Sequence, residues 1–178
     1  MTIKENMNIL KLKYLVLSFC AMTSLAFVSC DKNSHSDDDI IAINKENKEK
    51  GETFLAENRN AEGVVETFSG LQYKIDSLGS GEKPILTDSV KLEYVGKKTN
   101  GEIFVSNTDM LLVSAQIDGL AQGLRYMPEG SKFTLYIPYY LGYGVGGRSF
   151  SSKGKTVNIG AYSALIFECE LHSVKHNK

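Results

Sequence analysis

Residues 165–171 read LIFECEL, a stretch that alternates between two kinds of side chain. The odd-numbered residues are apolar, and two of the three even-numbered residues are glutamates. An alternation with a period of two predicts a β-strand that buries one face, as the strands of antiparallel sheets do. The same alternation recurs in residues 71–75, 90–94 and 133–137. We therefore expect an antiparallel sheet built from several such strands.

Asn100 and Gly101 stand between two extended segments, residues 90–98 and 102–104. The pair is typical of a type I′ hairpin turn, in which both central residues have positive φ. The two segments are therefore expected to pair. A second turn is indicated at residues 127–130, which read MPEG, with proline second and glycine fourth.

Residues 118–127 carry the one helical pattern inside the sheet region. Leu120, Leu124 and Met127 recur at helical spacing, and Asp118 is expected to act as the N-cap. A sheet with one wet face and a single short amphipathic helix predicts an α+β domain, with the helix covering the other face.

The length of 178 residues leaves room for one domain of roughly 100 to 150 residues and an N-terminal segment. The net charge of −1 gives no basic surplus, so nucleic acid is not an expected partner. No cofactor motif is found. The histidines, at positions 35, 172 and 176, have no partner at metal-ligand spacing in the sequence, so no metal site is expected.

The first 29 residues are predicted to be a secretion signal. Lys4, Lys11 and Lys13 precede an apolar run of 15 residues, Tyr14 to Val28. An uncleaved membrane anchor is the alternative, but a spanning helix needs about 20 residues.

Residues 27–30, FVSC, resemble a bacterial lipobox in which Cys30 becomes the lipid-modified first residue, with Phe27 in place of the usual leucine. This implies a membrane anchor at Cys30 and a location in the cell envelope, on the outer membrane or facing the periplasm. Ordinary cleavage near Ser29, which would leave Cys30 as a free thiol, is the alternative. Only Cys169 then remains in the body of the protein, which excludes a disulfide framework.

Residues 30–39 are polar and acidic and are expected to form a flexible tether. An acidic run at this place also resembles the surface-export signals of Bacteroidetes lipoproteins, so surface display and a plain solvated linker both stay open. Residues 40–62 favour an exposed connector helix that is interrupted at Gly51 and contacts the domain by one end. The domain itself is predicted to span residues 63–178.

A set of short runs follows in a fixed order along the chain: residues 54–58 (FLAEN), 63–65 (GVV), 69–74 (SGLQYK), 127–131 (MPEGS), 136–138 (YIP), 141–144 (LGYG) and 165–171. Together they resemble FKBP-type peptidyl-prolyl cis-trans isomerases of the macrophage-infectivity-potentiator-like branch. The resemblance covers roughly residues 51 to 175. It implies an antiparallel sheet of five or six strands wrapped around one short helix, with proline-containing polypeptides as clients. A large dimerisation domain of the kind found in some relatives is not expected, and the oligomeric state stays open.

The resemblance also implies a set of site residues. Tyr94 and Phe104 would form pocket walls, Phe167 would lie deep inside and Tyr143 would stand at the mouth. Four further residues complete the set: Val105 beside Phe104, Ile117 on the rim, Leu120 on the floor and Ile159 closing one side. The Tyr143 hydroxyl and the Ile117 N–H would bind substrate carbonyls. Taken singly, each of these residues also fits an ordinary core position.

Two of these positions depart from the family pattern. Val105 stands where the family has an aspartate, and one such polar contact contributes roughly 1 to 4 kcal/mol, so the rate is expected to fall about ten- to several-hundred-fold. Leu120 replaces the usual tryptophan, which is expected to weaken binding of macrolide inhibitors. Asn158, Gly160 and Ala161 also differ from the usual loop.

Residues 144–163 form a connection of about 20 residues without an evident strand or helix, which is typical of a functional loop. Phe150 would make it a flap that grips substrate. Three functions then remain, in the order in which we favour them: an active isomerase, a catalytically weak peptide-binding module, and a structural lipoprotein that uses the same fold.

Overall fold

The structure is a computed structural model that describes residues 36–152 and 155–177. In chain order its elements are α2 (Asp37–Asn58), β1 (Val64–Glu66), β2 (Gln72–Ser77), β3 (Ser89–Lys98), β4 (Ile103–Leu112), η1 (Val113–Ala115), α3 (Asp118–Leu124), β5 (Lys132–Ile137), η2 (Tyr139–Leu141), β6 (Arg148–Ser152), β7 (Lys155–Ile159) and β8 (Leu165–Lys175).

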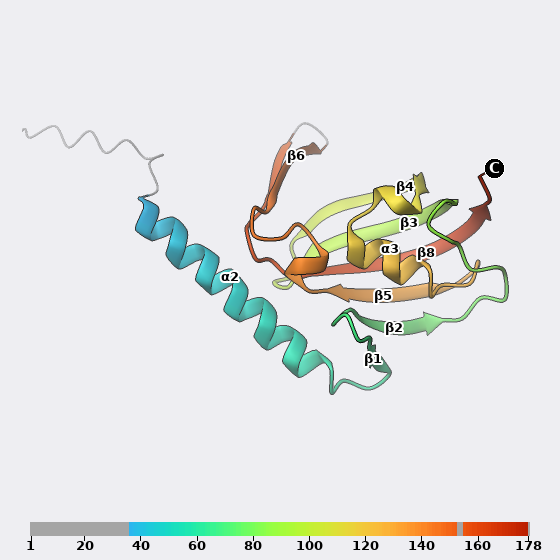
Figure 1. Ribbon diagram of the computed structural model, residues 1–178, viewed down its shortest axis with the longest axis horizontal. Coiled ribbons are helices and arrows are strands. Elements are labelled where there is room, and N and C mark those ends of the chain that lie inside the picture. Colours follow the sequence, from blue (N-terminus) through green and yellow to red (C-terminus); the bar gives the residue numbers. More distant parts are fainter. Residues whose placement is uncertain (1–35, 153–154, 178) are drawn as a thin grey trace, which may run out of the picture. The chain divides into compact units, whose positions relative to one another are not determined.

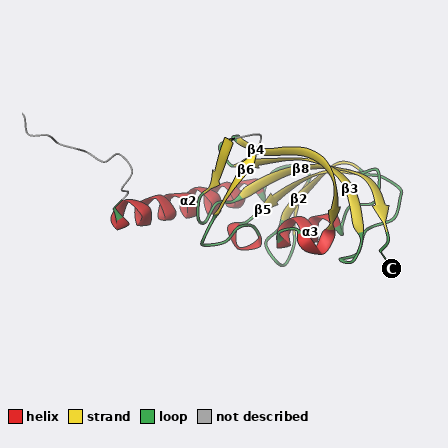
Figure 2. Cartoon of the chain, turned by 90° about the horizontal axis from the view of Figure 1, so that it is seen from above, coloured by secondary structure: helices red, strands yellow, loops and turns green. Residues whose placement is uncertain are grey.

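Six strands form one antiparallel sheet in the order β1-β2-β5-β8-β3-β4, which confirms the expected α+β fold (Figure 1). β8 lies between β5 and β3, at the middle of the sheet. Leu165, Phe167, Cys169 and Leu171 are all buried, as their alternation predicts. Viewed from above, the curved sheet covers α3, which lies against one face (Figure 2).

The contact between α3 and the sheet depends on two glycines. Leu120, Ala121 and Leu124 of α3 are buried against the sheet. A Cβ at Gly119 would overlap the side chain of Ile137, and one at Gly123 would overlap that of Leu135. The helix backbone can therefore lie close to β5 only because these two positions have no side chain.

The helix α3 is shorter than its apolar pattern indicates. It begins at Asp118, Ile117 is its N-cap, and no side chain caps it, so the expected capping role of Asp118 is wrong. Asp118 instead lies in the first turn, where a carboxylate interacts favourably with the helix dipole. The helix ends at Leu124, and Met127 is buried from the turn beyond it.

The connection between β3 and β4 is a three-residue loop rather than a type I′ turn. Gly101 has φ +86°, but Asn100 has no positive φ. The Lys98 carbonyl accepts from the Gly101 N–H at 2.9 Å, and the Lys98 N–H donates to Glu102 O at 2.9 Å. This is the pattern of a type I turn followed by a left-handed glycine. The expected pairing of the two strands is confirmed.

The helix α2 begins three residues earlier than the connector expected from the sequence. Ser36 and Asp39 form a capping box, so residues 37–39 belong to the helix and not to a flexible tether. Residues 30–35 lie outside the described residues, as does the signal segment with Cys30. Gly51 does not interrupt the helix. It is buried at a close contact, where an added Cβ would lie 3.0 Å from the Ala164 Cβ.

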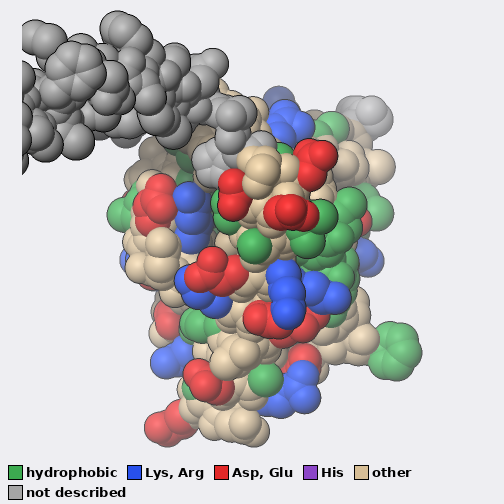
Figure 3. All heavy atoms as spheres, turned by 90° about the vertical axis from the view of Figure 1, so that its left-hand side faces the viewer, with side chains coloured by type: hydrophobic (Ala, Val, Ile, Leu, Met, Phe, Trp, Pro, Cys, Tyr) green, Lys and Arg blue, Asp and Glu red, His purple; other side chains and the backbone are tan. Residues whose placement is uncertain are grey.

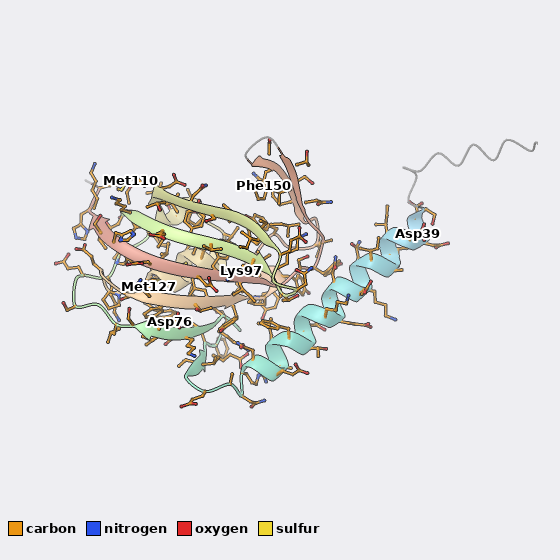
Figure 4. The ribbon with its side chains drawn as sticks, turned by 180° about the vertical axis from the view of Figure 1, so that it is seen from behind. Asp39, Asp76, Lys97, Met110, Met127 and Phe150 are labelled. Carbon is orange, nitrogen blue, oxygen red and sulfur yellow. The ribbon has the colours of Figure 1, made fainter. Side chains whose placement is uncertain are left out.

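The C-terminal half of α2 contacts the sheet region. Buried Gln72 accepts from Asn58 Nδ2 and donates through Nε2 to the Leu55 carbonyl, both at 2.8 Å. The Phe54 and Tyr136 rings lie 6.0 Å apart. The other end of the helix, marked by Asp39, extends away from the sheet (Figure 4). Acidic and basic side chains are interspersed over the face that holds α2 (Figure 3).

Residues 144–163 are not structureless, which corrects the expectation of an irregular loop. β6 and β7 pair as a hairpin in which Arg148 faces Ile159 and Phe150 faces Val157. Val157 and Phe150 are both half-buried against the core, so the hairpin has an apolar face of its own. None of the described helices is long and apolar enough to span a membrane.

Candidate functional site

All eight site residues expected from the sequence belong to the hydrophobic core of the domain or pack against it, and we call this set the aromatic site. Phe104, Leu120, Ile159 and Phe167 are each at most 3% exposed, and they form its base. Four half-buried residues pack around this base as a rim: Tyr94, Val105, Ile117 and Tyr143. An apolar base with a partly open rim suits a small apolar ligand such as a proline ring.

The rings of the site are arranged around Phe167. Phe104 meets it edge-on, with centroids 5.6 Å apart, and Tyr94 lies 6.4 Å away. Phe150, from β6, adds an edge-on contact to Phe104 at 6.5 Å. Phe150 lies on the hairpin that extends beyond the Lys97 end of the sheet, away from Met110 (Figure 4). The hairpin thus brings an additional aromatic residue to the aromatic site.

Gly96, which was not among the site residues predicted from the sequence, makes room for the packing of the Phe104 ring. Gly96 of β3 pairs with Val105, and the register shifts between Gly96 and Lys97. A Cβ at Gly96 would lie 2.6 Å from the Phe104 ring and 2.6 Å from the Val105 side chain. The available signal was a glycine inside a strand pattern, which often marks a close approach.

Two hydroxyls border the site, and both stay protonated near neutral pH. Burial raises the pKa of Tyr143, and nearby Arg148 opposes that rise. Among the described residues, the Tyr143 hydroxyl has no hydrogen-bond partner. The Tyr94 hydroxyl donates to Asp109 Oδ2 at 3.3 Å. Burial is the main cause of a raised pKa at Tyr94 as well.

Ile117 and Leu120 reach the site from α3. Ile117 is the N-cap, with extended backbone at φ −59° and ψ 148°, and its carbonyl accepts the first helical hydrogen bond from Ala121 at 2.9 Å. Leu120 lies one turn further on and is buried below the rings. The start of the helix thus places half-buried Ile117 against the hydrophobic core.

The site contains no nucleophile suited to covalent chemistry. Cys169 of β8 is the one cysteine among the described residues, and its side chain is buried in the core. Burial raises the pKa of its thiol far above the usual range, so it remains protonated and unreactive.

His172 has neighbours that the sequence spacing did not show. Ligand atoms of Glu93, Glu170 and His172 lie within 4.8 Å of one another. Glu170 also pairs with Lys132 at 2.8 Å, and His172 Nε2 lies 3.3 Å from Glu93 Oε2. The three residues come together because β3 and β8 are neighbours in the sheet. These contacts are ion pairs at the protein surface.

Comparison with known families agrees with this geometry. The family model described as FKBP-type peptidyl-prolyl cis-trans isomerase matches residues 80–172. A second model, described as the domain amino-terminal to such isomerases, matches residues 26–75.

Curated relatives point the same way. The isomerase FkpA of Aeromonas hydrophila is 38% identical over 135 residues, covering 73% of this chain and 47% of the relative. Outer membrane protein MIP of Legionella longbeachae is 39% identical over 139 residues, covering 74% of this chain and 55% of the relative. The chain thus spans about half the length of these relatives.

Solved structures share the fold. A peptidyl-prolyl cis-trans isomerase from Pseudomonas syringae pv. tomato aligns with a TM-score of 0.65 at 29% identity, covering 74% of this chain and 96% of that one. FkpA from Escherichia coli aligns with a TM-score of 0.72 at 23% identity, covering 99% of this chain and 74% of that one. On the matched family model and the relatives above 30% identity, this chain belongs to the FKBP-type peptidyl-prolyl cis-trans isomerase family.

Proposed function

We propose that this chain is a peptidyl-prolyl cis-trans isomerase that assists the folding of exported proteins. The observation that carries the proposal is the packing of the aromatic site. Its residues come from β3, β4, β7, β8, α3 and the segments next to α3 and η2. The rings of Tyr94 and Phe104 contact that of Phe167, and the remaining residues belong to the same hydrophobic core or pack against it. Two of the four rim residues, Tyr94 and Tyr143, place a hydroxyl beside the apolar base.

The reaction needs no covalent step. Rotation about an X–Pro bond faces a barrier of about 18–20 kcal/mol because the amide loses its resonance. A protein lowers that barrier by binding the twisted amide more tightly than the planar one. The buried base would hold the proline ring away from water, and the positive edges of the surrounding rings would face the carbonyl oxygen as it turns.

Two polar groups would hold the peptide on either side of the proline. The Tyr143 hydroxyl stays protonated and has no partner among the described residues, so it is available to donate to a substrate carbonyl. The N–H of Ile117, at the start of α3, would bind a second carbonyl. With the peptide held at both points, rotation would be confined to the X–Pro bond.

A catalytically weak peptide-binding module is the second candidate, and one observation favours it. Val105 is half-buried and packs against the apolar cluster at the position where family members carry a carboxylate. The hairpin residue Phe150 adds apolar contact surface to the site. Such a site would bind proline-containing segments well and turn them over slowly.

The test is an isomerisation assay of the full-length chain on a proline tetrapeptide, followed by exchange NMR. Activity that falls about tenfold or more in Tyr143→Phe supports the isomerase, since one lost charge-stabilising donor has roughly that effect. Binding of the same peptide with no detectable turnover would favour the binding module. The absence of both would leave the fold in a structural role.

We also propose that the protein resides in the cell envelope, held to a membrane by lipid at Cys30. The lipobox-like residues 27–30 support this, as does the name of the Legionella longbeachae relative, an outer membrane protein. In a bacterial host, labelled fatty acid should be incorporated into the wild type and lost in Cys30→Ser. Equal labelling of the two would contradict the anchor.

A further inference from the structure

The register between β3 and β4 brings two polar residues to the rim of the aromatic site. Tyr94 pairs with Asn107, and Leu92 pairs with Asp109. Directly paired residues of antiparallel strands project from the same face of the sheet. Because Leu92 is fully buried on the face that carries the core, Asn107 and Asp109 project toward that face too. Val105 completes this row, opposite Gly96.

Asp109 makes a direct contact with the site. It is the diagonal neighbour of Tyr94, a position that a long aromatic side chain can reach. The Tyr94 hydroxyl donates to Asp109 Oδ2 at 3.3 Å. Asp109 is exposed, so its carboxylate keeps its hydration while it accepts this bond.

We propose that Asp109 is a positioning residue for isomerisation, which fixes the Tyr94 ring in the aromatic site and supplies the carboxylate that position 105 lacks. The proposal rests on the isomerase function proposed above. With its proton directed to Asp109, the Tyr94 hydroxyl cannot rotate to compete for the peptide carbonyls. The ring then keeps one orientation, tilted by 33° to the Phe167 ring at a centroid distance of 6.4 Å.

The titration of Tyr94 agrees with this contact. Burial raises the pKa of Tyr94 most, and the charge of Asp109 and the hydrogen bond to it act in the same direction. The Asn107 side chain acts in the opposite direction, and Tyr143 raises the Tyr94 pKa slightly further. If Asp109 holds the Tyr94 proton in solution, its removal must lower the Tyr94 pKa.

The experiment compares kcat/KM of the full-length chain with five variants: Asp109→Ala, Asp109→Asn, Tyr94→Phe, the double variant Tyr94→Phe with Asp109→Ala, and Thr108→Ala. Thr108 is the matched control because it neighbours Asp109 on β4 but projects from the opposite face. Asp109→Ala should lower kcat/KM about fivefold, the size expected for one exposed charge-assisted hydrogen bond. Asp109→Asn, which still accepts a hydrogen bond, should lose less.

Two readouts separate positioning from a loss of folding. The double variant should be no slower than Tyr94→Phe alone, because Asp109 acts only through the Tyr94 hydroxyl. In NMR of protein labelled with ¹³C at the tyrosine Cζ, assigned with Tyr94→Phe, the Tyr94 pKa should be lower in Asp109→Ala than in wild type.

The possible outcomes separate a failure of the proposed isomerase function from a failure of the proposed role of Asp109. An inactive wild type contradicts the isomerase function and this role with it. If the wild type is active, three results would overturn the role of Asp109 while leaving the isomerase function intact. These are equal kcat/KM values for Asp109→Ala and Thr108→Ala, additive losses of kcat/KM in the double variant, and an unchanged Tyr94 pKa in Asp109→Ala.

Discussion

The aromatic site and the interface of α2 are both places where the sheet region contacts another segment, but they differ in whether their polar groups have hydrogen-bond partners. At the α2 interface the buried amide of Gln72 is hydrogen-bonded at both its oxygen and its nitrogen. At the aromatic site the Tyr143 hydroxyl has no partner among the described residues. The first interface is complete without a ligand, whereas the second leaves a donor for one.

The two regions meet at the segment that follows β7. Ile159 belongs to the base of the aromatic site, and two residues later the Ala161 carbonyl accepts from Asn47 Nδ2 of α2 at 3.1 Å. Gly51 of α2 lies against Ala164 in the same segment. The comparison therefore predicts that changes at α2 affect stability and changes at the aromatic site affect turnover, with this segment as the point of contact.

Removal of residues 1–60 should have the largest effect on stability. Residues from Val64 onward carry the sheet and α3, so we expect them to fold alone. The loss of two hydrogen bonds to Gln72 and of the packing of Phe54 should cost about 2–4 kcal/mol, which lowers the unfolding midpoint by roughly 10 °C. Circular dichroism during thermal unfolding measures this.

Activity of the same truncated domain sharpens the comparison. If the two regions are independent, kcat/KM should stay within about twofold of the full chain. A tenfold loss in a domain that still unfolds cooperatively would show that α2 supports Ile159 through residues 160–164. A truncated domain without a folded spectrum would show that α2 belongs to the core.

Val105→Asp should raise isomerase turnover, because the rings proposed to hold proline are present while position 105 has no carboxylate. The added stabilisation of the transition state is expected to be on the order of 1 to 3 kcal/mol. Half-burial opposes this, since an unpaired carboxylate raises its own pKa and costs stability. The gain should be larger in an Asp109→Asn background, where no carboxylate is present at the rim. The measurement is kcat/KM on a proline tetrapeptide, with folding checked for each variant.

A folded Val105→Asp protein no faster than wild type would contradict this account of the site. The peptide-binding module would then be the better description of the molecule.

Asn58→Ala should act on stability alone. It leaves the buried Gln72 Oε1 without its donor, at a cost of about 1–2 kcal/mol. Because Gln72 lies outside the aromatic site, kcat/KM should not change. Urea unfolding and the isomerase assay on the same preparation test both statements. Asn60→Ala, whose side chain donates to the Ala56 carbonyl within the same segment, is a matched control.

The smallest effect is expected at the C-terminal end, where His176 contacts Glu82 at 2.8 Å and buried Asp88 at 3.1 Å. Hydrogen bonds to both carboxylates raise the pKa of His176. The stabilisation is therefore fully present below the ordinary histidine value of about 6.5 and is lost as the pH rises through the raised value.

Removal of the histidine tests the predicted loss of stabilisation with rising pH. His176→Gln should lower the unfolding midpoint near pH 5.5 by a small amount, and by less near pH 8.5. An equal shift at both values would show that the contact does not depend on the charge of His176.

Most strands were predictable because their signal is local. Residues 165–171 alternate along their own length, so the strand and its buried face follow from the residues themselves. The site residues were reached through the resemblance, because a tyrosine or phenylalanine on a strand looks the same in a core and in a binding site. In the structure the rings of Tyr94 and Phe104 both contact that of Phe167, and the other predicted site residues belong to the same hydrophobic core or pack against it.

The wrong predictions arose where a local residue pattern is compatible with more than one structure. Gly51 reads as a helix break, but its missing side chain serves a close contact with Ala164, a residue far along the chain. Asn100 and Gly101 suit a type I′ turn, but the register of β3 and β4 leaves a three-residue loop. Asp118 has the chemistry of a cap, yet the helix already includes it.

The class of fold, the alternating strands and the family were predictable from the residues alone, because they depend on periodicity and on short runs of neighbouring residues. Three contacts became visible only in the folded chain: Asp109 with Tyr94, His172 with Glu93, and Phe150 with Phe104. Each of these contacts depends on the register between strands or on a hairpin folding back. The alternation fixes which face of each strand is buried and so excludes a slip of one residue, but a slip of two residues would keep that face and change every cross-strand partner.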